Sequence, residues 1–125
     1  MRYAYNRQVE PPAPFIHASL KCLETGKSLD NVPALVDTAA DRTVIPGRLV
    51  DLLALVPLEE ILVAGLGGQA SSAPTYKVEL TIRMLLPEKV VLIAHDEEPF
   101  ILLGRDVLNR HRVLLDGPGL ALEID

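Results

Sequence analysis

The hydrophobic positions of this chain fall into many short runs, and most of these runs are typical of β-strands. Residues 75–85 alternate apolar and polar side chains, which predicts a half-buried strand. Residues 89–94 and 100–103 are continuous apolar runs, a pattern typical of strands that are buried on both faces. Further strands are predicted at residues 15–23, 32–37, 59–63, 113–115 and 120–124. Many short strands at this spacing predict an all-β domain, either a small barrel or a sandwich.

Helical patterns are confined to two short segments. Residues 47–55 could form a short helix that ends before Pro57, and residues 105–109 could form one helical turn. Residues 1–13 are polar and then proline-rich, so we expect a flexible N-terminal arm. With 125 residues in total, residues 14–125 are expected to form a single domain.

The clearest chemical signal is an acidic residue at the end of an apolar strand. The strand predicted at residues 32–37 leads directly into Asp37 and Thr38, two alanines follow, and the chain soon becomes apolar again. A carboxylate between two buried strands is costly unless it is paired, hydrogen-bonded or used in chemistry. Asp37 is therefore the first candidate for a functional residue.

Composition and charge exclude several classes of function. The net charge is −5 and no basic run is present, which argues against nucleic acid and anionic membrane surfaces as partners. A single cysteine excludes a disulfide framework and a zinc–cysteine cluster, so a reducing compartment is expected. The first residues contain no apolar segment of signal-peptide length, and no later run is long enough to cross a bilayer. We expect a soluble cytoplasmic domain.

The remaining polar groups have ordinary interpretations. The three histidines are scattered, which favours structural or solvent-facing roles over metal binding. The acidic segment at residues 95–98 is interpreted as a solvated loop rather than a cation site. Cys22 lies in a predicted strand and is interpreted as a small core or surface thiol.

Three separated segments together resemble the retropepsin-like, single-domain aspartic proteases, the retroviral type of aspartyl protease. Residues 36–45 (VDTAADRTVI) resemble the catalytic loop, residues 64–68 (AGLGG) the tip of the flap, and residues 99–106 (PFILLGRD) the strand and helix behind that loop. The resemblance spans residues 15–124 and implies a small closed β-barrel with one or two short helical segments. It also implies an aspartic endopeptidase that acts on peptides or proteins without a cofactor or a metal ion.

The chemistry of such an enzyme requires two carboxyl groups about one water molecule apart. One must be ionised to take a proton from the water, and the other protonated to stabilise the developing oxyanion. Like charges at this separation cannot both ionise cheaply, so the two groups share a proton. The chain has only one Asp-Thr motif, so the dyad requires Asp37 from each of two copies, and we expect a homodimer.

The resemblance also assigns roles to the neighbours of Asp37. Thr38 is expected to form a hydrogen bond across the dimer axis, and Ala39 to offer its backbone carbonyl to the substrate. Ala40 stands where two-domain relatives have a hydroxyl that stabilises the catalytic anion, so activity nearer neutral pH is expected. Asp41 is expected to pair with Arg105 and to accept a substrate amide.

The resemblance assigns the substrate pocket to two further segments. Phe100 and Leu102 are expected to line it, which predicts cleavage beside large apolar residues. Gly65, Leu66 and Gly67 are expected to form the flap tip, which closes over the substrate and excludes water.

The sequence departs from the family pattern at one informative position. Ala39 stands where the family usually has glycine, and its added Cβ lies on a turn close to the partner chain and the substrate. An alternative is therefore a catalytically weak or inactive dimer that binds peptides or acts as a scaffold. A purely structural β-domain of a larger assembly is a third reading.

Overall fold

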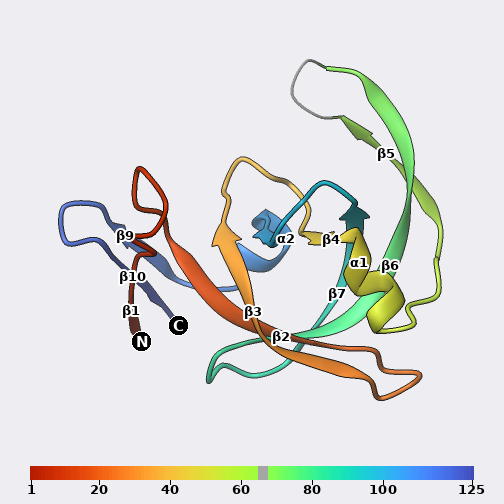
Figure 1. The fold of residues 1–125 in the computed structure, drawn as a ribbon, viewed down its shortest axis with the longest axis horizontal. Coiled ribbons are helices and arrows are strands. Elements are labelled where there is room, and N and C mark those ends of the chain that lie inside the picture. The colour runs from red at the N-terminus through yellow and green to blue at the C-terminus, as the bar shows by residue number, and fades with distance from the viewer. Residues whose placement is uncertain (65–67) are drawn as a thin grey trace.

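The computed structural model describes residues 1–64 and 68–125, which form ten β-strands and two short helices (Figure 1). The helices are α1 (Gly47–Leu52) and α2 (Arg105–Leu108). The strands are β1 (Arg2–Ala4), β2 (Phe15–Lys21), β3 (Ser28–Val36), β4 (Val44–Pro46), β5 (Glu60–Ala64), β6 (Ala70–Ile82), β7 (Glu88–His95), β8 (Ile101–Leu103), β9 (Val113–Asp116) and β10 (Ala121–Ile124). Neither helix is long and apolar enough to cross a membrane.

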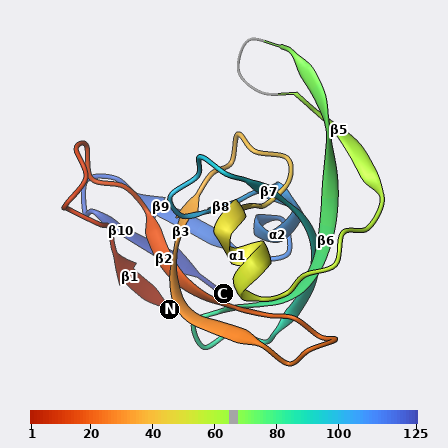
Figure 2. The same cartoon turned by 45° about the vertical axis from the view of Figure 1, so that its right-hand side comes forward.

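Six strands close into a barrel, which confirms the all-β prediction and decides for the barrel over the sandwich. The strands follow the order β2-β3-β8-β4-β7-β6, and β6 pairs again with β2. Strand β8 pairs in parallel with β3 and antiparallel with β4, so it connects the two strands that flank Asp37. Strand β5 pairs only with β6 among the described strands, and the β5–β6 hairpin reaches away from the barrel (Figure 2).

The barrel interior is filled by aliphatic side chains. The predicted alternation holds in β6, where Val78, Leu80 and Ile82 are fully buried. The apolar run of β7 is not buried on both faces as expected, because a barrel strand keeps one face outward and Val91 is 40% exposed. Cys22 is a core thiol, and hydrogen bonding to Thr25 lowers its pKa.

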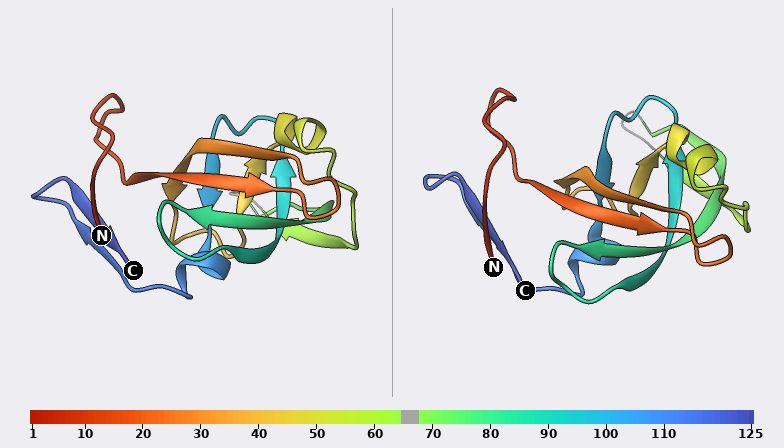
Figure 3. Two further views of the ribbon diagram at one scale, coloured as in Figure 1. Left: turned by 90° about the horizontal axis from the view of Figure 1, so that it is seen from below. Right: turned by 60° about the horizontal axis from the view of Figure 1, so that its bottom comes forward.

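The two ends of the chain form a second, three-stranded sheet in the order β1-β10-β9. Residues Arg2–Ala4 pair with Ala121–Glu123, so this part of the expected flexible arm is a strand (Figure 3). A strand of three residues shows no periodicity in the sequence, and its partner lies more than a hundred residues away. The Met1 ammonium group contacts the Asp125 carboxylate at 2.8 Å and holds the pKa of that carboxyl below its usual value.

Candidate active site

Asp37 follows the last residue of β3, where the backbone of β8 fixes its position. Its N–H donates to the carbonyl oxygen of Leu103 at 3.0 Å, which extends the parallel β3–β8 ladder by one step. The chain then turns, and the N–H of Ala40 donates to the carbonyl oxygen of Asp37 at 3.2 Å. The N–H of Ala39 donates to Asp37 Oδ1 at 3.1 Å, so the turn itself orients the carboxylate. The Asp37 side chain is half-buried, and Thr38 beside it is exposed.

Arg105 holds this turn through backbone carbonyl groups. Its Nη1 donates to the carbonyl oxygens of Thr38 at 2.9 Å and Ala39 at 3.3 Å. Its backbone N–H donates to the carbonyl oxygen of Ala40 at 2.9 Å. Three consecutive residues after Asp37 are therefore tied to the first residue of α2.

The expected ion pair between Asp41 and Arg105 is absent from the described part of the chain. No Arg105 nitrogen lies within 4.0 Å of the Asp41 carboxylate, because the guanidinium group is directed to the carbonyls of the turn. Asp41 is instead exposed and contributes to the lining of a cleft. Arg105 holds the loop after Asp37 through backbone carbonyl groups, so the expectation that Asp41 is its partner is wrong.

Asp106 is a site residue that the sequence analysis did not identify. Its carboxylate accepts hydrogen bonds from the Thr43 N–H at 3.0 and 3.1 Å and from the Thr43 hydroxyl at 2.7 Å. The same Thr43 hydroxyl oxygen accepts the N–H of Gly104 at 3.1 Å, and Thr43 is fully buried. Asp106 therefore fixes the far end of the loop that begins at Asp37. The signal was its place directly after Arg105, in the first turn of α2.

Gly104 is required by the close approach of two backbone segments. A Cβ at this position would lie 2.6 Å from the carbonyl carbon of Arg42 and 2.9 Å from the Thr43 nitrogen. Real Cβ atoms do not approach backbone so closely, so only glycine lets β8 and α2 pack directly behind the loop. The loop between β3 and β4 is thus held at its start by Arg105, at its end by Asp106, and from behind by Gly104.

A cleft of about 520 Å³ lies beside this loop. The loop forms one wall, the outer strand β5 of the hairpin forms another, and the end of β7 closes the floor. The described residues that line it are Ala39, Ala40, Asp41, Arg42, Val44, Ile61, Leu62, Val63, Ala64, Ile93, His95 and Glu98. Figures 1 and 2 show the hairpin and the loop on the same side of the barrel.

Three residues expected at the flap tip, Gly65, Leu66 and Gly67, lie outside the described residues. Phe100 and Leu102 are described but are not among the residues that line the cleft of the single chain. The Phe100 ring packs edge-on against Phe15, with ring centroids 4.7 Å apart. Their contact with substrate stays a prediction that concerns the dimer.

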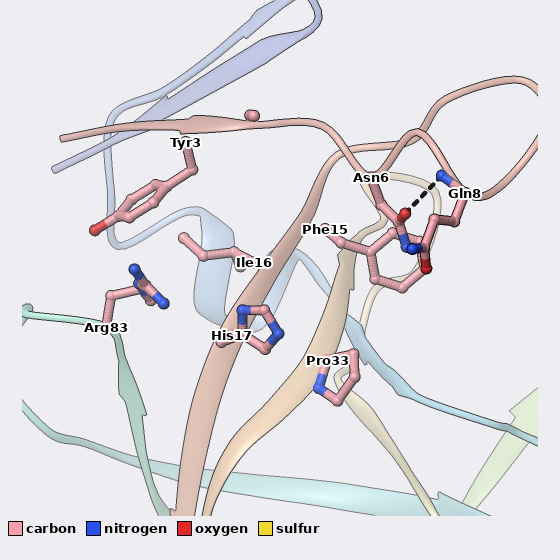
Figure 4. A pocket seen from close by; sticks show the side chains of 9 residues that line it. Tyr3, Asn6, Gln8, Phe15, Ile16, His17, Pro33 and Arg83 are labelled. Carbon is pink, nitrogen blue, oxygen red and sulfur yellow. Dashed lines mark hydrogen bonds between the residues drawn. The ribbon is translucent and has the colours of Figure 1, made fainter.

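A second cavity of about 560 Å³ lies between the N-terminal segment and strands β2 and β3 (Figure 4). The Arg83 guanidinium group lies over the Tyr3 ring at 5.0 Å, and the N–H of Gln8 donates to Asn6 Oδ1 at 2.9 Å. None of the residues that line this cavity is an acid, so it has no carboxylate for general base chemistry. The cleft beside the loop that begins at Asp37 is the candidate active site.

The geometry of the loop agrees with comparisons to known proteins. The family model described as retroviral aspartyl protease matches residues 12–116. The chain belongs to the retroviral aspartyl protease family. Retropepsin-like proteases of this family typically act as dimers on peptide substrates. No curated protein sequence matches the chain significantly.

Solved structures of retropepsin-like proteases share the fold at low sequence identity. A retropepsin-like aspartic protease from Rickettsia conorii superposes with a TM-score of 0.63 at 15% identity, covering 98% of this chain and 86% of that one. The EIAV protease in complex with the inhibitor HBY-793 gives 0.54 at 22% identity, covering 86% and 93%. The retroviral protease-like domain of Ddi1 from Leishmania major gives 0.57 at 16% identity, covering 90% and 88%.

Proposed function

We propose that this retropepsin-like protein is an aspartic endopeptidase whose active site forms between two copies of the chain. The observation that carries the proposal is the position of Asp37 at the start of a loop that is held at both ends. Residues 39–42 of this loop line the cleft of about 520 Å³, whereas Asp37 itself is not among the lining residues of the single chain. Each copy contributes one Asp37 carboxyl group to the dyad. The exposed Thr38 beside it is available for the expected hydrogen bond to its counterpart.

The reaction follows from the two carboxyl groups. The ionised Asp37 takes a proton from a water molecule as the water oxygen attacks the peptide carbonyl carbon. The protonated Asp37 of the other copy donates a hydrogen bond to the developing oxyanion and then a proton reaches the departing nitrogen. Two carboxylates so close share one proton because their mutual repulsion prevents both from ionising. Positioning matters here, since small displacements of reacting groups cost large factors in rate.

This mechanism is favoured by a fixed loop on one side of the cleft and a hairpin that can move on the other. The loop after Asp37 is anchored by Arg105 and Asp106, whereas β5 pairs with β6 alone among the strands of residues 1–64 and 68–125. A hairpin supported along one edge can move toward the loop and exclude water when a peptide binds. Ile61, Val63 and Ile93 give the cleft aliphatic walls, against which the apolar part of a substrate side chain can pack.

Ala39 supports the second candidate function, a weak or inactive dimer that binds peptides. Its φ angle is not among the positive values of the described chain, so the alanine causes no backbone strain in its own turn. Its side chain is exposed in the single chain. If the Ala39 methyl group lowers activity, it therefore does so through contacts with the partner chain or the substrate.

Peptide cleavage assays separate the two functions. The protein is incubated with casein and with a peptide library, alone and with a transition-state-mimic inhibitor of aspartic proteases. Cleavage that the inhibitor blocks and that Asp37→Asn abolishes supports the enzyme; cleavage that survives Asp37→Asn rules it out. If cleavage is weak, a large gain in Ala39→Gly identifies the methyl group as its cause.

A further inference from the structure

The candidate active-site cleft contains two acidic residues without cationic partners in the described chain. Asp41 and Glu98 both line the cleft, from the catalytic loop and from the segment after β7. Within residues 1–64 and 68–125, neither carboxylate has a cationic nitrogen within 4.0 Å. The sequence analysis interpreted residues 95–98 as a solvated loop, but Glu98 is half-buried at the edge of the cleft.

Among the described lining residues Arg42 is the one arginine or lysine, and the two carboxylates exceed its positive charge by one. Its guanidinium group keeps that charge but is bound to a backbone carbonyl group and not to either acid. Arg42 Nη1 donates to the carbonyl oxygen of Val91 at 3.0 Å, on β7. His95 Nδ1 lies 3.3 Å from the Glu97 N–H, within its own loop. The protein as a whole carries a charge of −5, which reinforces rather than offsets the local excess of acid.

The rest of the cleft is aliphatic, which fits a particular kind of side chain. Ile61 and Val63 from β5 and Ile93 from β7 offer apolar surface beside the two carboxylates. Lysine and arginine have an apolar stem and a charged end, and they bury the stem on such surfaces while the charge stays near solvent or an anion. A large neutral side chain would contact the apolar wall but would leave the two carboxylates without a cation.

We infer that the cleft selects peptides that carry a lysine or arginine side chain, with Glu98 as the main determinant and Asp41 as its support. The inference rests on the proposed function for the location of the substrate, and it names the substrate class. The basic residue occupies the cleft beside the loop, while the scissile bond is adjacent to a large apolar residue. An acidic residue at the same substrate position is rejected by like-charge repulsion.

Asp96 supplies a matched control for Glu98. It belongs to the same acidic segment, but its side chain lies against Gly47 at the start of α1, where it leaves no room for a Cβ. It contributes to a separate surface pocket with Pro74 and Tyr76. Each of the two variants, Glu98→Gln and Asp96→Asn, therefore removes one negative charge, but only Glu98→Gln removes it from the cleft.

The test compares peptides that differ at one position, which is occupied by lysine, norleucine or glutamate. Separate sets of peptides place this position at different distances from the cleaved bond. At low salt we expect the best lysine peptide to exceed its norleucine counterpart about fivefold in kcat/KM, the upper range of an accessible ion pair. Glu98→Gln should reduce this ratio toward one, whereas Asp96→Asn should leave it unchanged. High salt should reduce the ratio in the wild-type protein. Equal kcat/KM for lysine and norleucine at every position, or an unchanged ratio in Glu98→Gln, overturns the inference.

Binding keeps the inference testable if the proposed function fails. The same fluorescent peptides are titrated against the wild-type protein and Asp37→Asn, and affinity is measured by anisotropy. If nothing is cleaved but the lysine peptide binds more tightly in a Glu98-dependent way, the enzyme proposal fails and the inference holds. Equal binding of the three peptides, or no binding of any of them, overturns the inference as well.

Discussion

Arg105 Nη1 lies 2.9 Å from the carbonyl oxygen of Thr38, so the residue that follows Asp37 is held by a charged donor from α2. A second bond from the same nitrogen reaches the carbonyl oxygen of Ala39 at 3.3 Å. Because these acceptors are backbone atoms, the bonds fix the path of the main chain and leave the side chain of Thr38 free to face a partner copy. Under the proposed function, the contact helps one chain to prepare half of a shared active site.

Replacement of this arginine tests the role of its long side chain. We expect Arg105→Lys to weaken both carbonyl contacts, because lysine Nζ lies one bond closer to the backbone than the arginine Nη1 that makes them. The expected loss is about 1 kcal/mol in the free energy of unfolding, measured by urea denaturation, with a larger fractional loss of kcat/KM. Asp41→Asn should not reproduce the loss of stability, since Asp41 forms no ion pair with Arg105 in the described chain. If Asp41→Asn loses as much stability as Arg105→Lys, the result would indicate that Asp41 and Arg105 do form the expected ion pair.

Removal of the Asp106 carboxylate should destabilise the protein strongly. Asp106→Ala leaves the hydroxyl and the N–H of the fully buried Thr43 without their acceptor. Unsatisfied buried donors cost about 1–3 kcal/mol each, so we expect a loss of at least about 2 kcal/mol in urea denaturation. Asp106→Asn keeps one acceptor oxygen and should cost less. Equal stability of Asp106→Ala and the wild type would show that Asp106 does not hold the loop.

A single methyl group at Gly104 should be poorly tolerated. The new Cβ would lie 2.6 Å from the Arg42 carbonyl carbon, so β8 and the catalytic loop would have to separate. We expect Gly104→Ala to lower the free energy of unfolding by about 1–3 kcal/mol, as overpacked sites do, and to reduce activity. Gly117→Ala is the matched control, because a Cβ there meets nothing within 4 Å. The prediction fails if the two variants have the same thermal midpoint.

The missing hydroxyl at Ala40 predicts a change in the pH dependence of activity. In Ala40→Ser the new hydroxyl can donate to the Asp37 carboxylate, which favours the ionised form. The acidic limb of the kcat/KM profile should then move to lower pH, because the ionised carboxylate persists further into acid. Ala4→Ser makes the same chemical change on β1 and should leave the profile in place. An unchanged profile in Ala40→Ser, or a shift toward alkaline pH, would contradict the assigned role.

The sequence predicted those features that side-chain patterns encode. The alternation at residues 75–85 predicted the second half of β6, which begins earlier, at Ala70, and ends at Ile82. The apolar segment at residues 32–37 predicted the end of β3, the strand that leads into Asp37. The helix expected at residues 47–55 ends earlier, at Leu52, and Ala54 follows with φ at 53°. Hydrophobicity alone did not indicate this left-handed residue, because alanine is otherwise a strong helix former.

Features that depend on backbone atoms or on distant pairing could not be predicted in the same way. Arg105 binds carbonyl oxygens, which every residue possesses and no sequence pattern marks, whereas the family resemblance implied Asp41 as its partner. Strand β1 is defined only by β10 at the other end of the chain. The bonds between Asp106 and Thr43 join residues 63 positions apart. The place of Asp106 directly after Arg105 marks it as a candidate but does not indicate Thr43 as its partner.

If two chains share one dyad, they bind one active-site inhibitor between them, so the stoichiometry of inhibitor binding tests the proposed function. A transition-state-mimic inhibitor is titrated calorimetrically into the protein, with chain concentration determined by amino-acid analysis and Asp37→Asn as the control. We expect one inhibitor bound for every two chains, and no binding to Asp37→Asn. One inhibitor for each chain, or binding to a strict monomer, would contradict it.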